Sequence, residues 1–233
     1  TEGMVMVCKA LNLKKNDEII TVSNSFIATC GAIAYAGCKP ILVDVDDSMN
    51  IDVDLIEKKI TKKTRAIMPV HLSGIPSNID KIKKISKKNK LFFIEDAAHA
   101  FGGKYKNRYL GTLGDIGIFS LHPRKNFHVL GDGGLIVTNN KKIYKKLKLL
   151  RNHGLKNRNL SELWGTNSRL DNLQASFGNI FLKSINKMNK KFLNIADYYT
   201  KNLKEYVQTP IYNKKTSTPT FHQYIIRTNQ RNK

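Results

Sequence analysis

Cysteine is scarce in this sequence. Its three cysteines, Cys8, Cys30 and Cys38, are odd in number and show no Cys-x-x-Cys spacing. A disulfide-stabilised secreted domain or a zinc ribbon needs paired or clustered cysteines, so neither class fits. Unpaired cysteines are typical of a reducing compartment, and we therefore expect a cytoplasmic protein.

Long apolar runs are also missing. No stretch approaches the roughly 20 residues that a helix needs to span a bilayer, and the first residues show no secretory signal pattern. We therefore expect no membrane partner. The 233 residues include 41% hydrophobic and 25% charged side chains. This ordinary globular composition excludes a wholly disordered chain.

Acidic residues are few relative to basic ones. There are 40 lysines and arginines against 18 aspartates and glutamates, which gives a formal charge of +22. Such a charge can attract nucleic acid. The densest basic stretch, residues 139–160, contains a single aromatic residue, Tyr144, which does not make a base-stacking platform. We interpret most lysines as solvated helix faces and expect no nucleic-acid partner, with a functional basic patch as the alternative.

Short apolar segments alternate with amphipathic ones along the first part of the chain. After a helical pattern in residues 1–13, the sequence predicts strands at 18–22, 40–43, 65–70, 91–94, 115–120 and 134–138, and helices at 26–36, 53–60, 79–89 and 141–151. Wholly apolar strands that alternate with helices are typical of α/β proteins with a parallel sheet covered on both faces.

The last part of the chain has a different pattern. A helical pattern at 170–207 is long enough to need a break or to connect two domains, and FHQYIIR at 221–227 predicts a strand. We therefore expect a large cofactor-binding domain, residues 1–180, followed by the start of a smaller C-terminal domain, residues 181–233. The apolar helix face at residue 1 and the unpartnered last strand lead us to expect that both domains are incomplete.

Three segments carry chemically useful residues next to predicted strands or helices. Asp96 follows an apolar strand in EDAAHAFGG, Lys125 follows another in FSLHPRKNFHVLGDGG, and Asn167 precedes a helix in GTNSRLDNLQA. Taken singly, they have ordinary roles as a helix cap, a solvated lysine and a capping segment. Ligands of open α/β sheets bind at the carboxyl ends of the strands, where these residues are expected.

Together these residues supply what a pyridoxal phosphate site requires. A lysine forms an imine with the cofactor's aldehyde and must lose its proton first, which partial burial favours. A carboxylate keeps the pyridine nitrogen protonated, and hydroxyl and N–H groups at a helix N-terminus bind the phosphate. The order Asp96, Ser120-x-x-x-x-Lys125 and then Gly-Asp-Gly-Gly is more specific than any single residue.

At these residues the sequence resembles the DegT/DnrJ/StrS-type family of pyridoxal phosphate-dependent nucleotide-sugar aminotransferases. The matching segments span essentially the whole chain, in the order SNSFIATCGAIAYAGCKPILVDVD, IMPVHLSGIP, FIEDAAHAFGGKYKNRYLGTLGDIGIFSLHPRKN, GDGGLIVT, RNHG and NSRLDNLQA. The resemblance implies the fold type I aminotransferase architecture, a mostly parallel sheet sandwiched by helices, here with an incomplete C-terminal small domain.

The resemblance also implies catalytic residues. Lys125 corresponds to the lysine that binds the cofactor covalently, and Asp96 to the partner of its ring nitrogen. His99 corresponds to the residue that approaches the cofactor's phenolic oxygen, with a core histidine as the alternative.

Further cofactor contacts are implied in the same way. Ser120 and Thr1 correspond to phosphate-binding positions, and Phe26 to the aromatic residue that stacks on the cofactor ring. Asn167 corresponds to an asparagine that reaches the phosphate in the neighbouring subunit, which implies a homodimer. His153 in RNHG corresponds to a position that often contacts substrate.

The sequence departs from the family pattern in places. Of the glycine- and threonine-rich loop that precedes the first helix in the family, only Thr1 is present. Arg124 stands where a small residue is usual. A cation there should lower the pKa of Lys125 or contact an anionic substrate.

The sequence therefore predicts a transaminase that transfers an amino group, with glutamate as the expected donor, to a nucleotide-linked keto-sugar. It would use pyridoxal 5'-phosphate and no metal, in polysaccharide biosynthesis. A sugar dehydratase of the same family is a rival candidate, although such enzymes replace the lysine with histidine. Two more candidates are a non-catalytic basic binding protein and a regulatory protein on the same fold.

Overall fold

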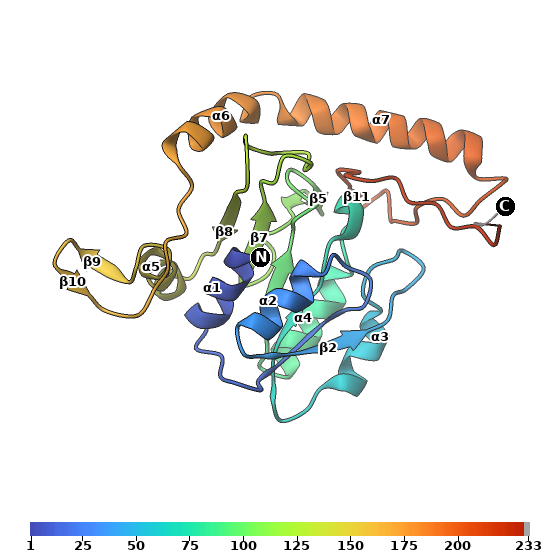
Figure 1. Cartoon of the computed structure of the whole chain (residues 1–233). Coiled ribbons are helices and arrows are strands. Elements are labelled where there is room, and N and C mark those ends of the chain that lie inside the picture. The colour runs from blue at the N-terminus through green and yellow to red at the C-terminus, as the bar shows by residue number, and fades with distance from the viewer. Residues whose placement is uncertain (231–233) are drawn as a thin grey trace.

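The computed structural model describes residues 1–230, and its centre is a six-stranded sheet (Figure 1). The strands, in the spatial order β2-β1-β3-β4-β7-β8, are β2 (Lys39–Val43), β1 (Glu18–Val22), β3 (Thr64–Met68), β4 (Phe92–Asp96), β7 (Ile116–Ser120) and β8 (Gly134–Val137). All neighbours pair in parallel except β7 and β8, which are antiparallel. This mostly parallel sheet confirms the predicted fold class.

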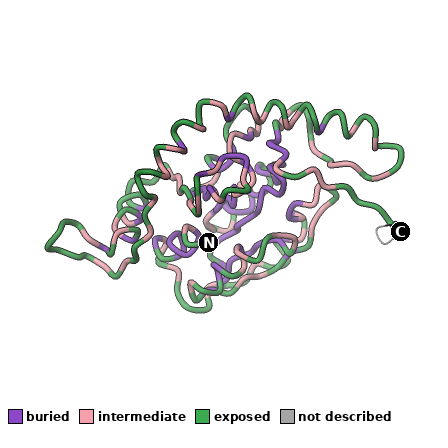
Figure 2. Tube along the Cα trace, turned by 45° about the horizontal axis from the view of Figure 1, so that its top comes forward, coloured by how far each residue is buried: buried purple, intermediate pink, exposed green. Residues whose placement is uncertain are grey.

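Helices cover both faces of the sheet (Figure 1). One core is formed by α1 (Glu2–Ala10), α2 (Ala28–Tyr35) and α5 (Lys141–Leu150), and the other by α3 (Val53–Ile56) and α4 (Ile79–Lys88). Successive strand residues point to opposite faces, so Ile19 belongs to the first core and Ile20 to the second. Figure 2 shows the buried residues gathered in the middle of the molecule.

The lysine-rich helices are amphipathic, as their spacing predicts. In α4, Ile79, Ile82 and Ile85 are buried. The Asn78 side chain accepts a hydrogen bond from the N–H of Lys81 (3.3 Å) and so caps the helix. The lysines of α4 lie on the other side of the helix, where Lys81 and Lys88 form exposed ion pairs with acidic residues of neighbouring segments.

Shorter elements complete the described part of the chain. They are the 3₁₀ turns η1 (Glu57–Lys59) and η2 (Leu72–Gly74), a small sheet of β5 (Lys104–Tyr105), β6 (Arg108–Tyr109) and β11 (Ser217–Thr218), and a hairpin of β9 (Leu155–Asn157) and β10 (Leu160–Ser161). The predicted helix at 53–60 is therefore a short α-helix followed by a 3₁₀ turn.

The helical pattern at 170–207 forms two helices, α6 (Asn172–Leu182) and α7 (Ile185–Leu203), which run along the top of the molecule in Figure 1. The Ser184 hydroxyl donates to the carbonyl of Phe181 (2.9 Å). A serine that bonds backbone in this way competes with the helical hydrogen-bond pattern, which accounts for the break between the helices.

The strand predicted at 221–227 is wrong. This segment is irregular, and its one bridge in the described chain joins Gln208 and Arg227. Phe221 has a φ of 45°, which lies in the left-handed region and interrupts an extended chain. Its side chain is buried against Ile75 and Ala196, so packing overrides the apolar pattern that predicted a strand.

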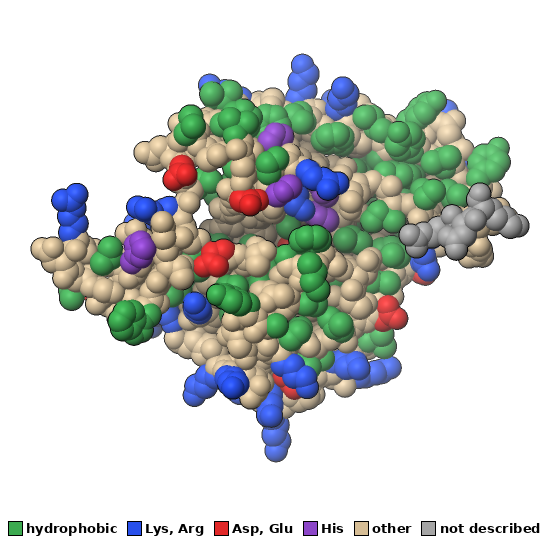
Figure 3. All heavy atoms as spheres, in the orientation of Figure 1, with side chains coloured by type: hydrophobic (Ala, Val, Ile, Leu, Met, Phe, Trp, Pro, Cys, Tyr) green, Lys and Arg blue, Asp and Glu red, His purple; other side chains and the backbone are tan. Residues whose placement is uncertain are grey.

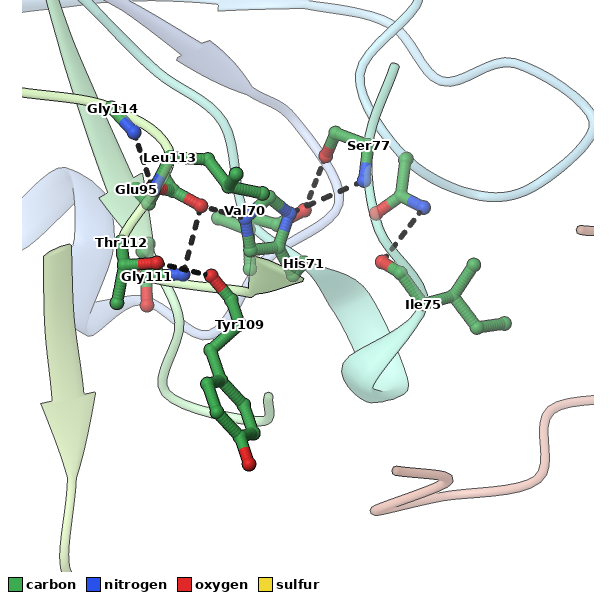
Figure 4. A network of polar contacts seen from close by, with 12 residues as sticks. Val70, His71, Ile75, Ser77, Glu95, Tyr109, Gly111, Thr112, Leu113 and Gly114 are labelled. Carbon is green, nitrogen blue, oxygen red and sulfur yellow. Dashed lines mark hydrogen bonds and ion pairs between the residues drawn. The ribbon is translucent and has the colours of Figure 1, made fainter. Parts of the chain in front are cut away.

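A buried pair, His71 and Glu95, lies near the end of β4 (Figure 4). Their side chains are fully buried, with His71 Nε2 3.0 Å from Glu95 Oε2. Glu95 also accepts backbone N–H groups of Gly111 (2.8 Å), Leu113 (2.6 Å) and Gly114 (2.5 Å). Burial raises the pKa of Glu95, but these hydrogen bonds bring that pKa below its usual value. The carboxylate is therefore ionised and joins β4 to the loop before β7.

We expect Glu95→Gln to destabilise the protein by about 3 kcal/mol, because the amide offers one acceptor and turns an N–H₂ group toward backbone donors. Urea denaturation at pH 7 measures this loss. Glu57→Gln, which removes an exposed ion pair with Lys88, is the control and should change stability by less than about 0.5 kcal/mol. Equal stability of the two variants would contradict the role of Glu95.

Candidate active site

The candidate site lies where β4 and β7 end. Asp96 and Ser120 are the last residues of these neighbouring parallel strands, so they lie at the same edge of the sheet. His99 follows β4, and Lys125 lies in the loop between β7 and β8. Figure 3 shows histidine, basic and acidic side chains gathered around a hollow in this face of the molecule.

Asp96 is only 2% exposed. Its Oδ2 accepts the hydroxyl of Thr29 from α2 (2.9 Å), and its Oδ1 accepts the N–H of Ala98 (3.1 Å). Residues 97–103 form turns, so Asp96 caps no helix. Burial raises the pKa of this carboxyl, against the hydrogen bonds from Thr29 and Ala98. A cation placed against it would stabilise its ionised form.

Lys125 is half-buried, and its pKa lies below the usual value. Burial is the largest cause, the charge of Asp96 opposes it, and the charge of Arg124 lowers the pKa further. The effect expected of Arg124 is therefore present, but desolvation exceeds it. A lysine with a lowered pKa holds a larger neutral fraction near pH 7, which a nucleophilic amine requires.

His99 is also half-buried, and it is held from several sides. Its Nδ1 accepts the N–H of Ser73 (3.2 Å), and its ring packs on that of His222 with 4.3 Å between centroids. Burial, and then the charges of Lys125 and His222, lower the pKa of His99 to about 3. The imidazole is therefore neutral at pH 7.

Two of the predicted phosphate-binding residues lie at the same edge. Ser120 is half-buried, and its Oγ accepts the N–H of His122 (3.3 Å). Thr1 precedes α1, whose start packs on β7 and β8, because a Cβ on Gly3 would lie 3.4 Å from Ile118 and Ile136.

The other two predicted residues are differently placed. Phe26 precedes α2 and is 73% exposed, although the N–H of Thr29 donates to its carbonyl (3.1 Å). Asn167 is exposed, and its Oδ1 accepts the Nε–H of Arg169 (2.9 Å). Within residues 1–230, Asn167 makes no hydrogen bond to the other predicted site residues; its backbone pairs with Asn152, beside His153.

Pattern reasoning missed Thr29, Ser73 and His222. Thr29 lies in a segment that looks like helix core, and Ser73 comes from an irregular turn. His222 lies in the segment predicted as a strand. The sequence contains no spacing signal for them, because they meet His99 and Asp96 only through long-range packing.

The whole chain, residues 1–233, matches the model of the DegT/DnrJ/EryC1/StrS aminotransferase family. The chain belongs to this family. This match confirms the predicted family and architecture. The family depends on pyridoxal phosphate, which confirms the predicted cofactor class.

Individual relatives are similar over nearly all of this chain. The "Pleiotropic regulatory protein" of Geobacillus stearothermophilus is 37% identical, over 99% of the chain and 63% of its own length. The GDP-perosamine synthase of Escherichia coli O157:H7 is 38% identical, over 96% of the chain and 61% of its own length. The chain thus spans less than two thirds of these relatives.

A solved structure shows the same fold. The crystal structure of S. venezuelae DesV in complex with a ketimine intermediate is 32% identical and has a TM-score of 0.95, over 99% of this chain and 62% of that one.

The residues present fit pyridoxal phosphate. Asp96 is a buried carboxyl that receives only neutral donors in the described residues, so it can take a cationic ring nitrogen. Lys125 supplies an amine with a lowered pKa, and the start of α1 supplies N–H groups for a phosphate. Within residues 1–230 no cluster of side chains has the makeup of a metal site, and no helix is long and apolar enough to cross a bilayer.

We expect Arg124→Gln to raise the pKa of Lys125, because the variant removes a positive charge that disfavours a second one. The rate at which an amine-directed reagent modifies Lys125, followed by peptide mass spectrometry across pH in the cofactor-free protein, measures that pKa. Arg158→Gln, on the exposed β9–β10 hairpin, is the control. An unchanged or lower pKa in Arg124→Gln would show that its charge does not act on Lys125.

Proposed function

We propose that this chain carries the active site of a nucleotide-sugar aminotransferase that uses pyridoxal phosphate. The observation that carries the proposal is a half-buried lysine of lowered pKa, Lys125, close enough to the buried carboxyl of Asp96 for the charge of that carboxyl to act on it, at the carboxyl end of a parallel sheet. The name of the GDP-perosamine synthase supports an amino sugar as product, and the ketimine in the DesV structure supports transamination chemistry.

Pyridoxal phosphate, when bound, supplies an electron sink for bond breaking beside an amino group. Lys125 has two tasks in this scheme. With the cofactor bound, Lys125 would hold it through Nζ, and as a free amine it would take and return a proton at the reacting carbon of the substrate. Burial of Lys125 makes the neutral amine available for both tasks.

Asp96 holds the proton on the ring nitrogen. A cationic ring beside the Asp96 carboxyl would lower the pKa of that carboxyl and so offset the effect of burial, which raises it. The ring nitrogen would then be protonated while Asp96 is ionised. Thr29 and Ala98 occupy one site on each carboxylate oxygen and fix its orientation.

The remaining predicted residues bind the cofactor in this proposal. Ser120 and the N-terminus of α1 at Thr1 contact the phosphate, Phe26 covers one face of the ring, and His99 donates to the phenolic oxygen. Asn167 is exposed and, within residues 1–230, makes no hydrogen bond to the other predicted site residues, which supports a homodimer in which it serves the partner's phosphate.

The donor and the setting complete the proposal. Glutamate supplies the amino group, a nucleotide-linked keto-sugar receives it, and the protein works in the cytoplasm in polysaccharide biosynthesis. Incubation with pyridoxal phosphate, glutamate and a panel of GDP-, UDP- and dTDP-linked keto-sugars should yield an aminated sugar and 2-oxoglutarate, both detectable by mass spectrometry. Cofactor binding without transfer to any member of the panel would contradict this substrate class.

A regulatory function is the second candidate, because the Geobacillus stearothermophilus relative has a regulatory name. The two candidates differ in what the cofactor does. A regulator would bind the cofactor without turnover, whereas a transaminase would convert bound cofactor to its amine form on addition of glutamate alone, with a change in the visible spectrum.

We expect Lys125→Ala to abolish covalent cofactor attachment, because the variant lacks the amine that attacks the aldehyde. Borohydride reduction followed by peptide mass spectrometry measures the attachment. Lys88→Ala, on the surface of α4, should retain it. Recovery of the cofactor on a different lysine in Lys125→Ala would refute the assignment.

We expect Asp96→Asn to bind the cofactor but to lose roughly 10³-fold in turnover, since a neutral amide does not hold the ring nitrogen protonated. Steady-state kinetics and the spectrum of the bound cofactor measure both properties. Asp80→Asn, at an exposed ion pair with Lys106, is the control. Near-normal turnover in Asp96→Asn would leave Asp96 with a structural role alone.

A further inference from the structure

Residues 219–222, named here the C-terminal strap, are fastened onto the candidate site. The N–H of His222 donates to the carbonyl of Ser73 (2.9 Å), and the fully buried Thr220 donates its hydroxyl to the carbonyl of His99 (2.6 Å). Asn126, next to Lys125, donates its amide to the carbonyl of Thr220 (2.9 Å). The strap therefore connects the loops that carry His99 and Lys125.

Gly74 allows this close approach. Its φ is +80°, and a Cβ there would lie 1.8 Å from Thr220 Oγ1 and 2.8 Å from the carbonyl oxygen of His99. Any other residue would push the strap away. The fit of the strap against η2 is consequently built into the backbone of the turn.

The hydrogen bonds assign the proton on His222. Asn126 uses its amide hydrogens on Thr220 and on Asn189 Oδ1 (3.4 Å), so its Oδ1 is an acceptor. This oxygen lies 3.0 Å from His222 Nδ1. Nδ1 of His222 therefore carries the proton, and Nε2 has a lone pair.

The same reasoning gives His99 the opposite tautomer. Its Nδ1 accepts the N–H of Ser73, so the proton of the neutral ring is on Nε2. Rotation of this ring by 180° would bring a carbon to the Ser73 donor, and the packed ring of His222 restricts such motion.

Burial is the main reason that both rings are neutral, and nearby positive charge acts in the same direction. Burial and the charges of Lys125 and His222 lower the pKa of His99 to about 3, and burial with Lys125 and Arg124 lowers the pKa of His222 to about 4. At neutral pH one ring therefore offers an N–H donor and its neighbour a lone pair.

We propose that His222 is a positioning residue: packed on His99, it holds that ring as a neutral Nε2–H donor for the cofactor's phenolic oxygen. The part of this inference that concerns the cofactor rests on the proposed function. The strap thus completes the cofactor site from a segment about 100 residues away from Lys125 in the sequence.

The first test uses the cofactor-free protein with ¹⁵N-labelled histidine, in which nitrogen shifts report tautomer and pKa. In the parent protein we expect His99 to stay in the Nε2–H form from pH 8 to about pH 5. His222→Ala should raise the pKa of His99 by about one unit and mix its tautomers, because the ring becomes hydrated and free to turn.

Variants separate ring packing from hydrogen bonding. His222→Phe keeps an aromatic ring but no Nδ1 donor, and it should preserve the tautomer of His99. His222→Asn keeps a hydrogen bond to Asn126 but lacks the ring, and it should raise the pKa of His99 and mix its tautomers as His222→Ala does. It therefore tests the loss of the ring if His222→Ala folds poorly. Gln223→Ala, at the exposed neighbouring position, is the matched control. An unchanged His99 tautomer and pKa in both His222→Asn and His222→Ala would overturn the proposal.

The second test measures the pH dependence of the visible absorbance of the bound cofactor. We expect His222→Ala to shift the absorbance titration and His222→Phe to restore it. An unshifted titration beside an altered His99 tautomer would overturn the link to the phenolic oxygen. If the parent protein shows the expected nitrogen shifts but does not bind pyridoxal phosphate, the proposed function is contradicted and the histidine arrangement is not.

Discussion

The candidate site depends on the hydrogen bonds that the buried carboxylate of Glu95 accepts. Burying an ion is costly unless its hydrogen-bonding capacity is filled, and here His71 and three backbone N–H groups fill it. These donors come from the segment after β3 and from the loop that leads into β7. Glu95 therefore joins the segment after β3, the end of β4 and the loop before β7. This network fixes the position of Asp96, the next residue in the chain.

The electrostatics of the site follow from partial removal of water. Burial disfavours the charged form of every ionisable group, so it raises the pKa of Asp96 and lowers the pKa values of Lys125 and His99. In the protein without cofactor, the Lys125 amine therefore has a larger neutral fraction than an exposed lysine, and the His99 imidazole is neutral. The cationic ring of a ligand would stabilise the ionised form of Asp96 and so offset part of the effect of burial. An anionic phosphate on the same ligand would accept hydrogen bonds from N–H groups at the start of α1.

The large basic excess is a separate matter from this chemistry. Many of the lysines lie on the outer sides of amphipathic helices such as α4, where Lys81 and Lys88 form exposed ion pairs. Such pairs contribute little to stability. The isoleucines on the inner side of α4 hold it on the sheet, so lysine content leaves the architecture unchanged.

The sequence by itself determined the order of strands and helices, the family, and the identity of Lys125, Asp96 and Ser120 as site candidates, because these depend on local patterns and short motifs. It misassigned residues 221–227, where burial of Phe221 and a left-handed backbone replace the strand. It also contained no sign of His222, Ser73 or Thr29. Tertiary structure alone decided these, because hydrogen bonds between residues such as Asn126 and Thr220 form only after distant segments pack together.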